Sequence, residues 1–508
     1  MKSHLTFLSL ASFVISLFLF SITSSFSQDK NFVGIKTLKE NGKVASQTIT
    51  VENKSGIRSF EQDKSINNSA AGEKYVLGGT VLWSTQDALA IANKVAINTA
   101  GNSALTGWGL NNQRVSLYSD LTSVPLWNFS TGTYDPVVDI SGDGSIIAAT
   151  AGKDFYILDP TTGNINYQFT LPDSLYASKV SVSRDGSMAI ALTSVFGTPN
   201  AVRVYAFDLS GFPSIKWTFD VPVIENKDWS GINFSASGSE VAITDRYHLY
   251  IFNSEDGTLI WDHFVENTQS PPAISGDGKV VCTADNSGFV QTWHFNSVSN
   301  EYDLLWQYHV PPGLYINWAS SVGISADGST IVAGSMITLS SGYDGSVMCF
   351  DTYGNGTPNW IYTGFGDLVN DISVSDDGKV AAAVSWGDYY QTLKKDLIVF
   401  DVTTGEPTFQ VTTPGSFFTV DMNPEGSRVI AGGKAVHARE FGNGGRLYFC
   451  EIDLGGGNVN GNVDLTNTSD DSGVLVKALG TARSTITDIN GDYTIENIPA
   501  GTYTISAG

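Results

Sequence analysis

The chain has 508 residues, with 28 Lys and Arg against 51 Asp and Glu, so its formal net charge at pH 7 is −23. A surface of this sign repels phosphate backbones and anionic headgroups, which excludes nucleic acid as a partner and disfavours anionic lipid. Hydrophobic residues make up 42% of the sequence, charged residues only 16%, and there are 52 glycines. This composition favours a β-rich, turn-rich protein with a large core, long enough for two or three domains.

The first 27 residues, MKSHLTFLSLASFVISLFLFSITSSFS, have the features of a signal peptide. Lys2 and His4 give a basic start, residues 5–20 are mostly apolar, and small residues precede Gln28. The alternative, a transmembrane anchor, is disfavoured because the apolar run is short and interrupted by serines. We expect cleavage after residue 27 and export, which makes the mature chain secreted or cell-surface, with no later segment able to span a membrane.

Residues 28–74 are polar and poor in aromatic side chains. Such a segment buries too little apolar surface to offset the entropy cost of ordering the chain. We expect a mostly extended or disordered leader. The alternative is that it adds a small strand to the domain that follows.

A short motif, typified by SGDGSIIAAT at residues 141–150, occurs eight times along the chain. Its shared glycine recurs every 40 to 52 residues, at positions 101, 144, 186, 238, 278, 328, 378 and 426, a period typical of propellers and solenoids. An alternating segment precedes the turn of each motif, and a run of small and branched apolar residues follows it. A second alternating segment then ends near an Asp-Gly turn, and a last segment is centred on an aromatic residue. Four short strands per unit predict an all-β fold, an eight-bladed β-propeller over residues 75–453.

The Gly-rich part of the motif is predicted to be a tight hairpin between the first and second strands of each blade. Asp-Gly supplies a positive φ at little cost in such a turn. The small residues that follow suit a crowded region between blades. A calcium loop is the alternative, but the D-x-D-x-D-G ligand spacing is absent.

The two ends of the repeat region complement each other. The eighth unit, from Phe417 to Asp453, lacks an aromatic fourth strand, whereas an orphan strand with Trp83 at its aromatic position occupies residues 78–86. We therefore predict that this N-terminal strand completes the last blade and closes the ring, which leaves no open edge.

The segments DPTTGNINYQF and NSEDGTLIWDHF resemble the repeats of quinoprotein-dehydrogenase-like eight-bladed propellers, and the S-x-D-G turns resemble those of WD-type propellers. The resemblance covers about residues 75–453. Quinone-dependent enzymes of this kind imply a catalytic acid, a calcium site in the central funnel and, in many members, a vicinal cysteine pair. This chain has no Cys-Cys, and neither the acid nor the calcium ligands can be assigned, so no cofactor is predicted.

Residues 454–459, LGGGNV, are predicted to be a Gly-rich linker. The segments GNV, SGVLVKALG and STITDINGDYTIENIPAGTYTI within residues 460–508 resemble the carboxypeptidase regulatory-like module, a small β-sandwich of the carbohydrate-binding-like superfamily. Members of that family have further strands beyond the last one here, so we expect a partial, truncated sandwich and a sequence that is a fragment. A signal peptide, a propeller and this module together are similar to secreted surface proteins of Bacteroidetes-type bacteria.

The residues with reactive side chains form no catalytic or metal-binding pattern. Cys282, Cys349 and Cys450 each lie in an apolar strand pattern and are expected to be free and buried. The histidines of the mature chain are scattered, at positions 248, 263, 294, 309 and 437. No H-E-x-x-H, G-x-S-x-G or C-x-x-C-H motif occurs, so neither a metal site nor a catalytic residue is predicted.

The aromatic residues divide into two sets. The first lies in the fourth strands and is predicted to pack between blades: Trp83, Trp127, Trp217, Trp261, Trp306 and Trp360. The second lies in or beside loops predicted to share one face of the ring: Trp108, Trp229, Tyr315, Trp318, Trp386, Tyr389 and Tyr390. Exposed aromatics on one rim indicate a binding surface. The alternative is that they plug the funnel or cap the blades.

These features favour a secreted or cell-surface binding or scaffold protein, expected to be a monomer, that holds a protein or glycan on its aromatic loop face. One alternative is an enzyme, either a degenerate quinoprotein or a hydrolase with its site in the funnel, which calcium and quinone binding would reveal. Another is an envelope assembly scaffold, which would capture other surface proteins from envelope extracts.

Overall fold

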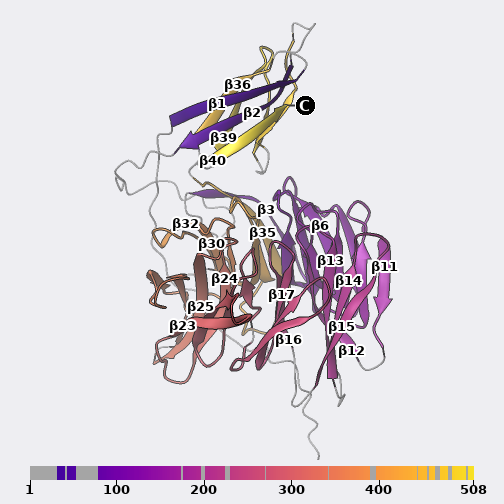
Figure 1. Cartoon of the computed structure of the whole chain (residues 1–508), viewed down its shortest axis with the longest axis vertical. Helices are drawn as coiled ribbons and strands as arrows, with labels where there is room; N and C mark the ends of the chain where they lie inside the picture. Colours follow the sequence, from indigo (N-terminus) through magenta and orange to yellow (C-terminus); the bar gives the residue numbers. More distant parts are fainter. Residues whose placement is uncertain are drawn as a thin grey trace, which may run out of the picture.

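The computed structural model describes residues 31–40, 43–52, 78–172, 175–195, 201–222, 229–268, 270–340, 342–389, 396–442, 444–454, 457–463, 470–478, 483–498 and 501–507. The predicted signal peptide, residues 1–27, lies outside them. Within the described residues every regular element is a strand, and the strands form a large lower body and a smaller upper one (Figure 1). The expectation of an all-β protein is confirmed.

The lower body consists of successive antiparallel sheets, numbered here in chain order. The first sheet contains β4 (Ile91–Ile97), β5 (Ser103–Gly109), β6 (Gln113–Ser119) and β7 (Trp127–Gly132). The second contains β8 (Val137–Ile140), β9 (Ile147–Ala151), β10 (Asp154–Leu158) and β11 (Ile165–Thr170). The third contains β12 (Leu175–Val182), β13 (Met188–Val195), β14 (Ala201–Asp208) and β15 (Ser214–Pro222). The fourth contains β16 (Trp229–Phe234), β17 (Glu240–Asp245), β18 (His248–Asn253) and β19 (Leu259–Phe264).

The remaining sheets of this body follow the same order of strands. The fifth contains β20 (Ala273–Ile274), β21 (Val280–Ala284), β22 (Phe289–Asn296) and β23 (Glu301–His309). The sixth contains β24 (Asn317–Ile324), β25 (Thr330–Leu339), β26 (Gly342–Asp344), β27 (Ser346–Asp351) and β28 (Trp360–Thr363). The seventh contains β29 (Val369–Val374), β30 (Val380–Ser385), β31 (Leu397–Asp401) and β32 (Glu406–Val411). The eighth contains β33 (Ser416–Met422), β34 (Arg428–Lys434), β35 (Gly445–Ile452) and β3 (Gly79–Asp87).

The repeated turn joins the first and second strands of each sheet, as predicted, and it is held by its own side chains. In the second sheet the Ser141 hydroxyl donates to Asp143 Oδ1 at 2.7 Å, and the same oxygen accepts from the Ser145 N–H at 2.9 Å. Gly144 has a φ of +77°, which a residue with a side chain adopts only under strain. The motif is therefore turn chemistry repeated once per sheet.

Neighbouring turns are also joined by backbone hydrogen bonds, which are made by the second residue of each motif. Thr99 donates its N–H to Gly142 O at 2.8 Å, and Gly142 donates in turn to the Arg184 carbonyl at 2.8 Å. On the other side, Ala326 donates to Asp376 O at 3.0 Å, and Asp376 to Pro424 O at 2.8 Å. Consecutive sheets thus meet along a line of backbone hydrogen bonds at one end of a central axis, which fixes their order around it.

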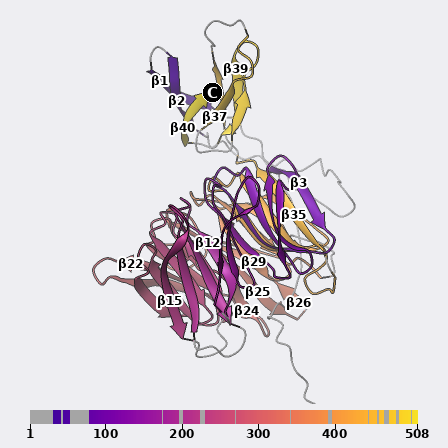
Figure 2. The same cartoon turned by 90° about the vertical axis from the view of Figure 1, so that its right-hand side faces the viewer.

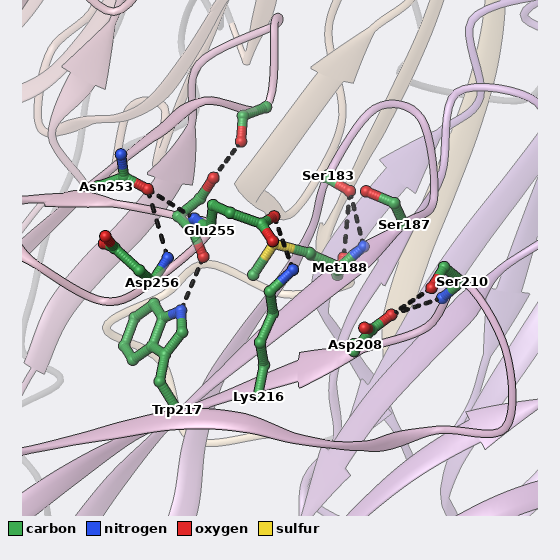
Figure 3. Close-up of polar contacts among 12 residues, drawn as sticks. Ser183, Ser187, Met188, Asp208, Ser210, Lys216, Trp217, Asn253, Glu255 and Asp256 are labelled. Carbon is green, nitrogen blue, oxygen red and sulfur yellow. Dashed lines mark hydrogen bonds and ion pairs between the residues drawn. The ribbon is translucent and has the colours of Figure 1, made fainter.

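The aromatic residue of the fourth strand locks each sheet to the next one. The Trp217 indole donates to the Ser254 carbonyl of the fourth sheet at 2.7 Å, beside the Lys216–Glu255 ion pair (Figure 3). The same bond, between 2.7 and 3.0 Å long, joins Trp83 to Ser119, Trp127 to Pro160, Trp306 to Thr352 and Trp360 to Val402. Five of the six predicted structural tryptophans therefore bridge neighbouring sheets by a hydrogen bond. Trp261 of the fourth sheet instead packs against Tyr302 of the fifth, with the two rings tilted and their centres 5.3 Å apart.

The N-terminal strand joins the last sheet, as its sequence predicted. β3 pairs antiparallel with β35, from Gly79 opposite Ile452 to Asp87 opposite Gly445, and the two strands lie side by side in both views (Figures 1 and 2). Trp83 stacks on Phe449 at 5.2 Å and faces Tyr118 of the first sheet at 5.3 Å. One apolar cluster thus joins the eighth sheet to the first.

The upper body combines both ends of the chain. β36 (Gly457–Asn462) pairs with β39 (Asp492–Ile498), and a second sheet has the order β1, β2, β40, β37, β38. Its strands are β1 (Asn31–Glu40), β2 (Lys43–Glu52), β37 (Leu475–Ala478), β38 (Ser484–Ile486) and β40 (Gly501–Ala507). Where the sequence predicted an extended or disordered leader, or a strand added to the propeller, β1 and β2 form a hairpin that pairs with β40 instead.

Two polar contacts of Arg483 tie the upper body to the eighth sheet. Glu451, near the end of β35, pairs with Arg428 of β34 at 2.7 Å and also with Arg483 of the upper body. Arg483 lies just before β38 and donates a second bond to the Ile452 carbonyl at 3.4 Å. The predicted linker, residues 454–459, is short because β36 already begins at Gly457.

The cysteines are free and buried, which confirms the prediction. Each lies in a strand core of a different sheet, Cys282 in β21, Cys349 in β27 and Cys450 in β35. Burial raises the pKa of Cys282 and Cys349 to about 12, so both thiols stay protonated and act as small apolar groups.

Candidate functional site

Two of the predicted loop aromatics are core residues instead of exposed rings. Trp108 lies within β5 and is 1% exposed, and Trp386 follows β30 directly and is 4% exposed. The Trp386 indole donates to Asn370 Oδ1 at 2.9 Å. The expectation of exposed rings is therefore wrong for both, because each continues the buried second strand of its sheet.

The other five predicted site residues are placed as follows. Tyr315 is 89% exposed, and Tyr389 is partly exposed with its ring edge against His437 at 5.3 Å. Trp318 is half-buried in β24, opposite Met336. Trp229 begins β16, but its side chain is outside the described residues, as is the whole of Tyr390.

Exposed apolar side chains lie in and beside loops of three consecutive sheets, the sixth, seventh and eighth. We call this surface the loop platform, and its members are Leu314, Tyr315, Leu339, Tyr389 and Phe441. The Leu314 N–H donates to the Thr338 carbonyl at 2.7 Å, which fixes the loop that carries Tyr315 against the end of β25. The Tyr389–His437 contact joins the loops of the seventh and eighth sheets.

The Arg439 side chain joins the loops that carry the loop platform. The Arg439 guanidinium lies 3.8 Å from the centre of the Tyr343 ring in β26, and its Nη2 is 3.3 Å from Asp367 Oδ2. Arg439 thus links loops of the eighth, sixth and seventh sheets. Sequence reasoning missed this contact because the three residues are separated by more than twenty positions each and belong to no common motif.

Asp367 is fully buried, and this burial raises its pKa to about 8, although Arg439 acts against the shift. The unfolded chain releases the same proton near pH 4. The favourable contribution of Asp367 to stability is therefore complete below about pH 4 and is lost as the pH rises toward 8. The loss is on the order of 1 kcal/mol per pH unit within that window.

The side-chain amide introduced by Asp367→Asn does not titrate between about pH 4 and pH 8. We therefore expect this substitution to flatten the dependence of folding stability on pH in that range. Thermal unfolding of the variant and of the parent protein, measured from pH 5 to pH 9, should show similar melting temperatures at pH 5. Toward pH 9 the parent should lose stability faster than the variant. Two parallel curves would contradict the pKa assigned to Asp367.

The innermost strands line a central channel with a volume of about 320 Å³. Lys94 of β4 projects among Asp139, Asp371 and Asp421, which come from the second, seventh and eighth sheets. Burial lowers the pKa of Lys94, but the three carboxylates outweigh it and raise the pKa overall. This amine is therefore a permanent cation at the axis.

The three aspartates of the channel clamp neighbouring sheets. Asp139 accepts the Val182 N–H at 2.8 Å, and Asp421 accepts the Ile97 N–H at 3.0 Å. Asp371 accepts the Val420 N–H at 3.1 Å. Burial raises the pKa of all three, and that of Asp421 to about 6. Their hydrogen bonds give them a structural role.

An ion pair crosses the channel at the end where the repeated turns meet. Arg184 of the third sheet binds Asp376 of the seventh through two bonds of 2.6 and 2.9 Å. Three sheets lie between the third and the seventh in each direction around the ring. The pair therefore spans the channel. Its side chains are partly exposed, with relative accessibilities of 40% and 37%.

Within the part of the chain that the structure describes, no group of three or more His, Cys, Asp or Glu side chains could hold a metal ion. No helix among those same residues is long and apolar enough to cross a membrane.

Comparisons with known proteins identify the fold. No family model and no curated protein matches the chain. The structure of Sqt1 from Chaetomium thermophilum, bound to the N-terminus of the ribosomal protein L10, aligns with 72% of this chain and 97% of its own, at 11% identity and a TM-score of 0.54. The β-propeller domain of Cps50 (Swd1) from Myceliophteria thermophila aligns with 74% of this chain and 99% of its own, at 10% identity and a TM-score of 0.47.

The large body is a β-propeller. This follows from repeated four-stranded antiparallel sheets around one axis together with the likeness to Sqt1. The WD-type resemblance of the turns agrees with it. At 11% identity this likeness shows the fold alone.

Proposed function

We propose that this chain is a secreted or cell-surface binding protein without catalytic activity, whose propeller holds a protein partner on the loop platform. The observation that carries the proposal is that Leu314, Tyr315 and Phe441 are exposed on loops that the Leu314–Thr338 bond and the Arg439 contacts hold in place. Large apolar side chains on a rigid support lose little entropy on binding and form the centre of protein interfaces.

The charge of the chain defines the partner more closely. With a net charge of −23, the protein attracts cationic segments and repels acidic ones over distances of about 10 Å. Tyrosine and phenylalanine rings accept both apolar side chains and cations on their faces. We therefore propose a partner segment that combines apolar and basic residues.

Finer features of the architecture belong to the same proposal. We propose that the numbered sheets are the eight blades of one monomeric ring. The two sheets of the upper body, whose core includes Val459, Val476 and Tyr493, support a carboxypeptidase regulatory-like sandwich. The basic start and apolar run of residues 1–27 support export.

The test is affinity capture from envelope and culture-supernatant extracts of the source organism. Tyr315→Ser and Phe441→Ser remove exposed rings from the loop platform without touching the core. Leu121→Ser and Val298→Ser are matched controls, because both side chains are at least 87% exposed but lie in turns at the opposite face. We expect the first pair to weaken capture of a discrete protein by roughly tenfold each, about 1–2 kcal/mol, and the controls to leave it unchanged.

The same variants separate the rival functions. If the protein binds a glycan on an array and Tyr315→Ser abolishes that binding, the partner is a sugar and not a protein. Tight binding of calcium or of a soluble quinone would support the enzyme reading and contradict a purely non-catalytic platform. Equal capture by all four variants would show that the loop platform is not the binding surface.

A further inference from the structure

The strand order places two kinds of loop at one end of the sheets, namely the loop after the second strand and the loop after the fourth. Neighbouring strands are antiparallel, so these loops share one face of the ring. The loop platform occupies this face on the sixth, seventh and eighth sheets. The loops around the first sheet add three exposed apolar side chains, which we call the first-sheet patch: Leu89, Leu110 and Tyr134, at 52%, 43% and 48% exposed. Leu89 lies between β3 and β4, Leu110 between β5 and β6, and Tyr134 between β7 and β8.

Leu110 has a backbone conformation that leucine rarely adopts. Its φ is +74°, and the other non-glycine residues with positive φ in the described part of the chain are all asparagines, Asn112, Asn267 and Asn300. Asparagine tolerates this region, whereas a leucine there is strained. The loop between β5 and β6 could therefore form with less strain if asparagine or glycine stood at this position. The turn itself does not require an exposed leucine at its tip.

Side chains of neighbouring segments hold Leu110 in this conformation. Asp135 Oδ1 accepts the Leu110 N–H at 2.7 Å, and Asp135 Oδ2 accepts from Asn93 Nδ2 at 3.3 Å. Gln113 Nε2 donates to the Leu110 carbonyl at 2.6 Å. Both backbone groups of Leu110 are thus bonded. Its side chain is presented in a fixed orientation before any partner binds, which lowers the entropy cost of binding.

The other two members of the first-sheet patch are also fixed in place. The Leu89 N–H donates to Asp87 Oδ1 at 2.7 Å. The Tyr134 carbonyl accepts from the Thr131 hydroxyl at 2.8 Å. The Tyr134 ring packs over Gly152, where a Cβ would lie 2.5 Å from a ring carbon. The patch is therefore a set of apolar groups on ordered loops.

The first-sheet patch is continuous with the loop platform through the loop of the eighth sheet. This loop carries Phe441 and, at Gly444, touches the segment between β3 and β4. A Cβ at Gly444 would lie only 2.9 Å from the Asp87 carbonyl oxygen, two residues before Leu89. The exposed apolar residues thus form an arc over consecutive sheets, from the sixth through the eighth to the first.

The exposed charges along this arc are negative. Asp135 beside Leu110 and Glu440 beside Phe441 are both exposed. Arg114, which donates to the Asn112 carbonyl at 3.1 Å, is neutralised by Asp87 at 2.9 Å. With a chain net charge of −23, the arc suits a segment in which lysine or arginine accompanies apolar residues.

We propose that the partner is an extended peptide segment with two apolar anchors separated by basic residues, one anchor on the loop platform and the other on the first-sheet patch. The inference rests on the proposed function and extends its surface around the ring. Two anchors on one segment bind more tightly than either alone, because the second contact forms within the complex. The cost of keeping Leu110 strained is then offset by binding at a second point.

The probe is a library of random peptides of about 16 residues displayed on phage, long enough to span roughly 50 Å when extended. The library is selected on the complete chain, and enriched peptides are synthesised with a fluorescent label and titrated by fluorescence anisotropy. We expect two apolar clusters with lysine or arginine between them. Each half of such a peptide should bind roughly 100-fold more weakly than the whole. Replacement of its basic residues by glutamate should abolish binding.

The variants Leu110→Asn and Tyr134→Ser test the first-sheet patch, and Tyr315→Ser tests the loop platform. Each should raise the Kd about tenfold. Val124→Ser is the matched control, because Val124 is 66% exposed on the same sheet but lies between β6 and β7, at the opposite face. Leu110→Asn should melt no lower than the parent, since asparagine relieves the strain. Weaker binding without lost stability is the signature of an anchor.

The outcomes separate this inference from the proposed function. Peptides that weaken with Tyr315→Ser but not with either patch variant would overturn the second anchor and leave the loop platform as the binding surface. Peptides that depend on the patch variants alone, or on none of the variants, would overturn both. A Leu110→Asn protein that melts well below the parent would show that the leucine supports the fold, and would overturn its assignment as an anchor.

Discussion

A protein that begins at Ala88 is expected to unfold about 10 °C or more below one that begins at Gly78, because the two differ only in the closing strand. Loss of β3 removes the whole ladder with β35 and exposes the Trp83 site between Phe449 and Tyr118. It also leaves the Ser119 carbonyl without its indole donor. Differential scanning calorimetry of the two proteins measures the effect.

A synthetic peptide of residues 75–90 provides the control for this experiment. If the shortened protein folds with an open edge, the peptide should bind in the place of β3 and restore most of the lost stability. Trp83→Ala in the full chain should cost roughly 3–5 kcal/mol by itself. Equal melting temperatures for the two truncated proteins would show that β3 does not close the ring.

Gly163→Ala is expected to destabilise the propeller by roughly 2–5 kcal/mol, which combines backbone strain with overpacking. Gly163 has a φ of +71°, and a Cβ at this position would lie 2.6 Å from the Trp127 ring. The ring cannot easily move, because its Nε1 is bonded to the Pro160 carbonyl at 2.9 Å and the side chain is buried. Chemical denaturation followed by tryptophan fluorescence measures the loss.

Gly132→Ala is the matched control for this substitution. Gly132 has a nearly identical φ of +74°, but nothing lies within 4 Å of the position of its Cβ. This variant therefore measures the backbone strain alone, about 1–2 kcal/mol. If the two variants lose the same stability, the contact between the glycine and the tryptophan ring contributes nothing to the joint between sheets.

The features that the sequence predicted correctly are those written locally and repeatedly. The S-x-D-G turn needs only neighbouring residues, since Ser141, Asp143 and Gly144 form it among themselves. The fourth-strand aromatic is recognisable because one recurs in the last segment of each of the first seven units. The closing strand could be predicted because the eighth unit lacks a fourth-strand aromatic residue and Trp83 supplies one.

The features that the sequence did not predict depend on depth and on distant partners. Trp108 and Trp386 lie at the point where the second strand ends, and a difference of one or two residues separates an exposed loop from a buried strand end. The Arg439 contacts join three separate loops. The pairing of β2 with β40 joins segments more than 440 residues apart. The sequence of neither strand specifies its partner.

The antiparallel register of the closing strand determines how the ring responds to mechanical tension. Gly79 is paired with Ile452, and the Asp453 N–H donates to the Gly78 carbonyl at 2.7 Å, so both continuations of the chain leave the ladder at the same end. A force that pulls these continuations apart would open β3 from β35 like a zipper, one pair at a time, instead of shearing all the pairs at once. The pairing of β2 with β40 ties the two continuations together above this point. Tension would therefore reach the ring only after the β2–β40 pairing has separated. The upper body thus protects the propeller from mechanical unfolding.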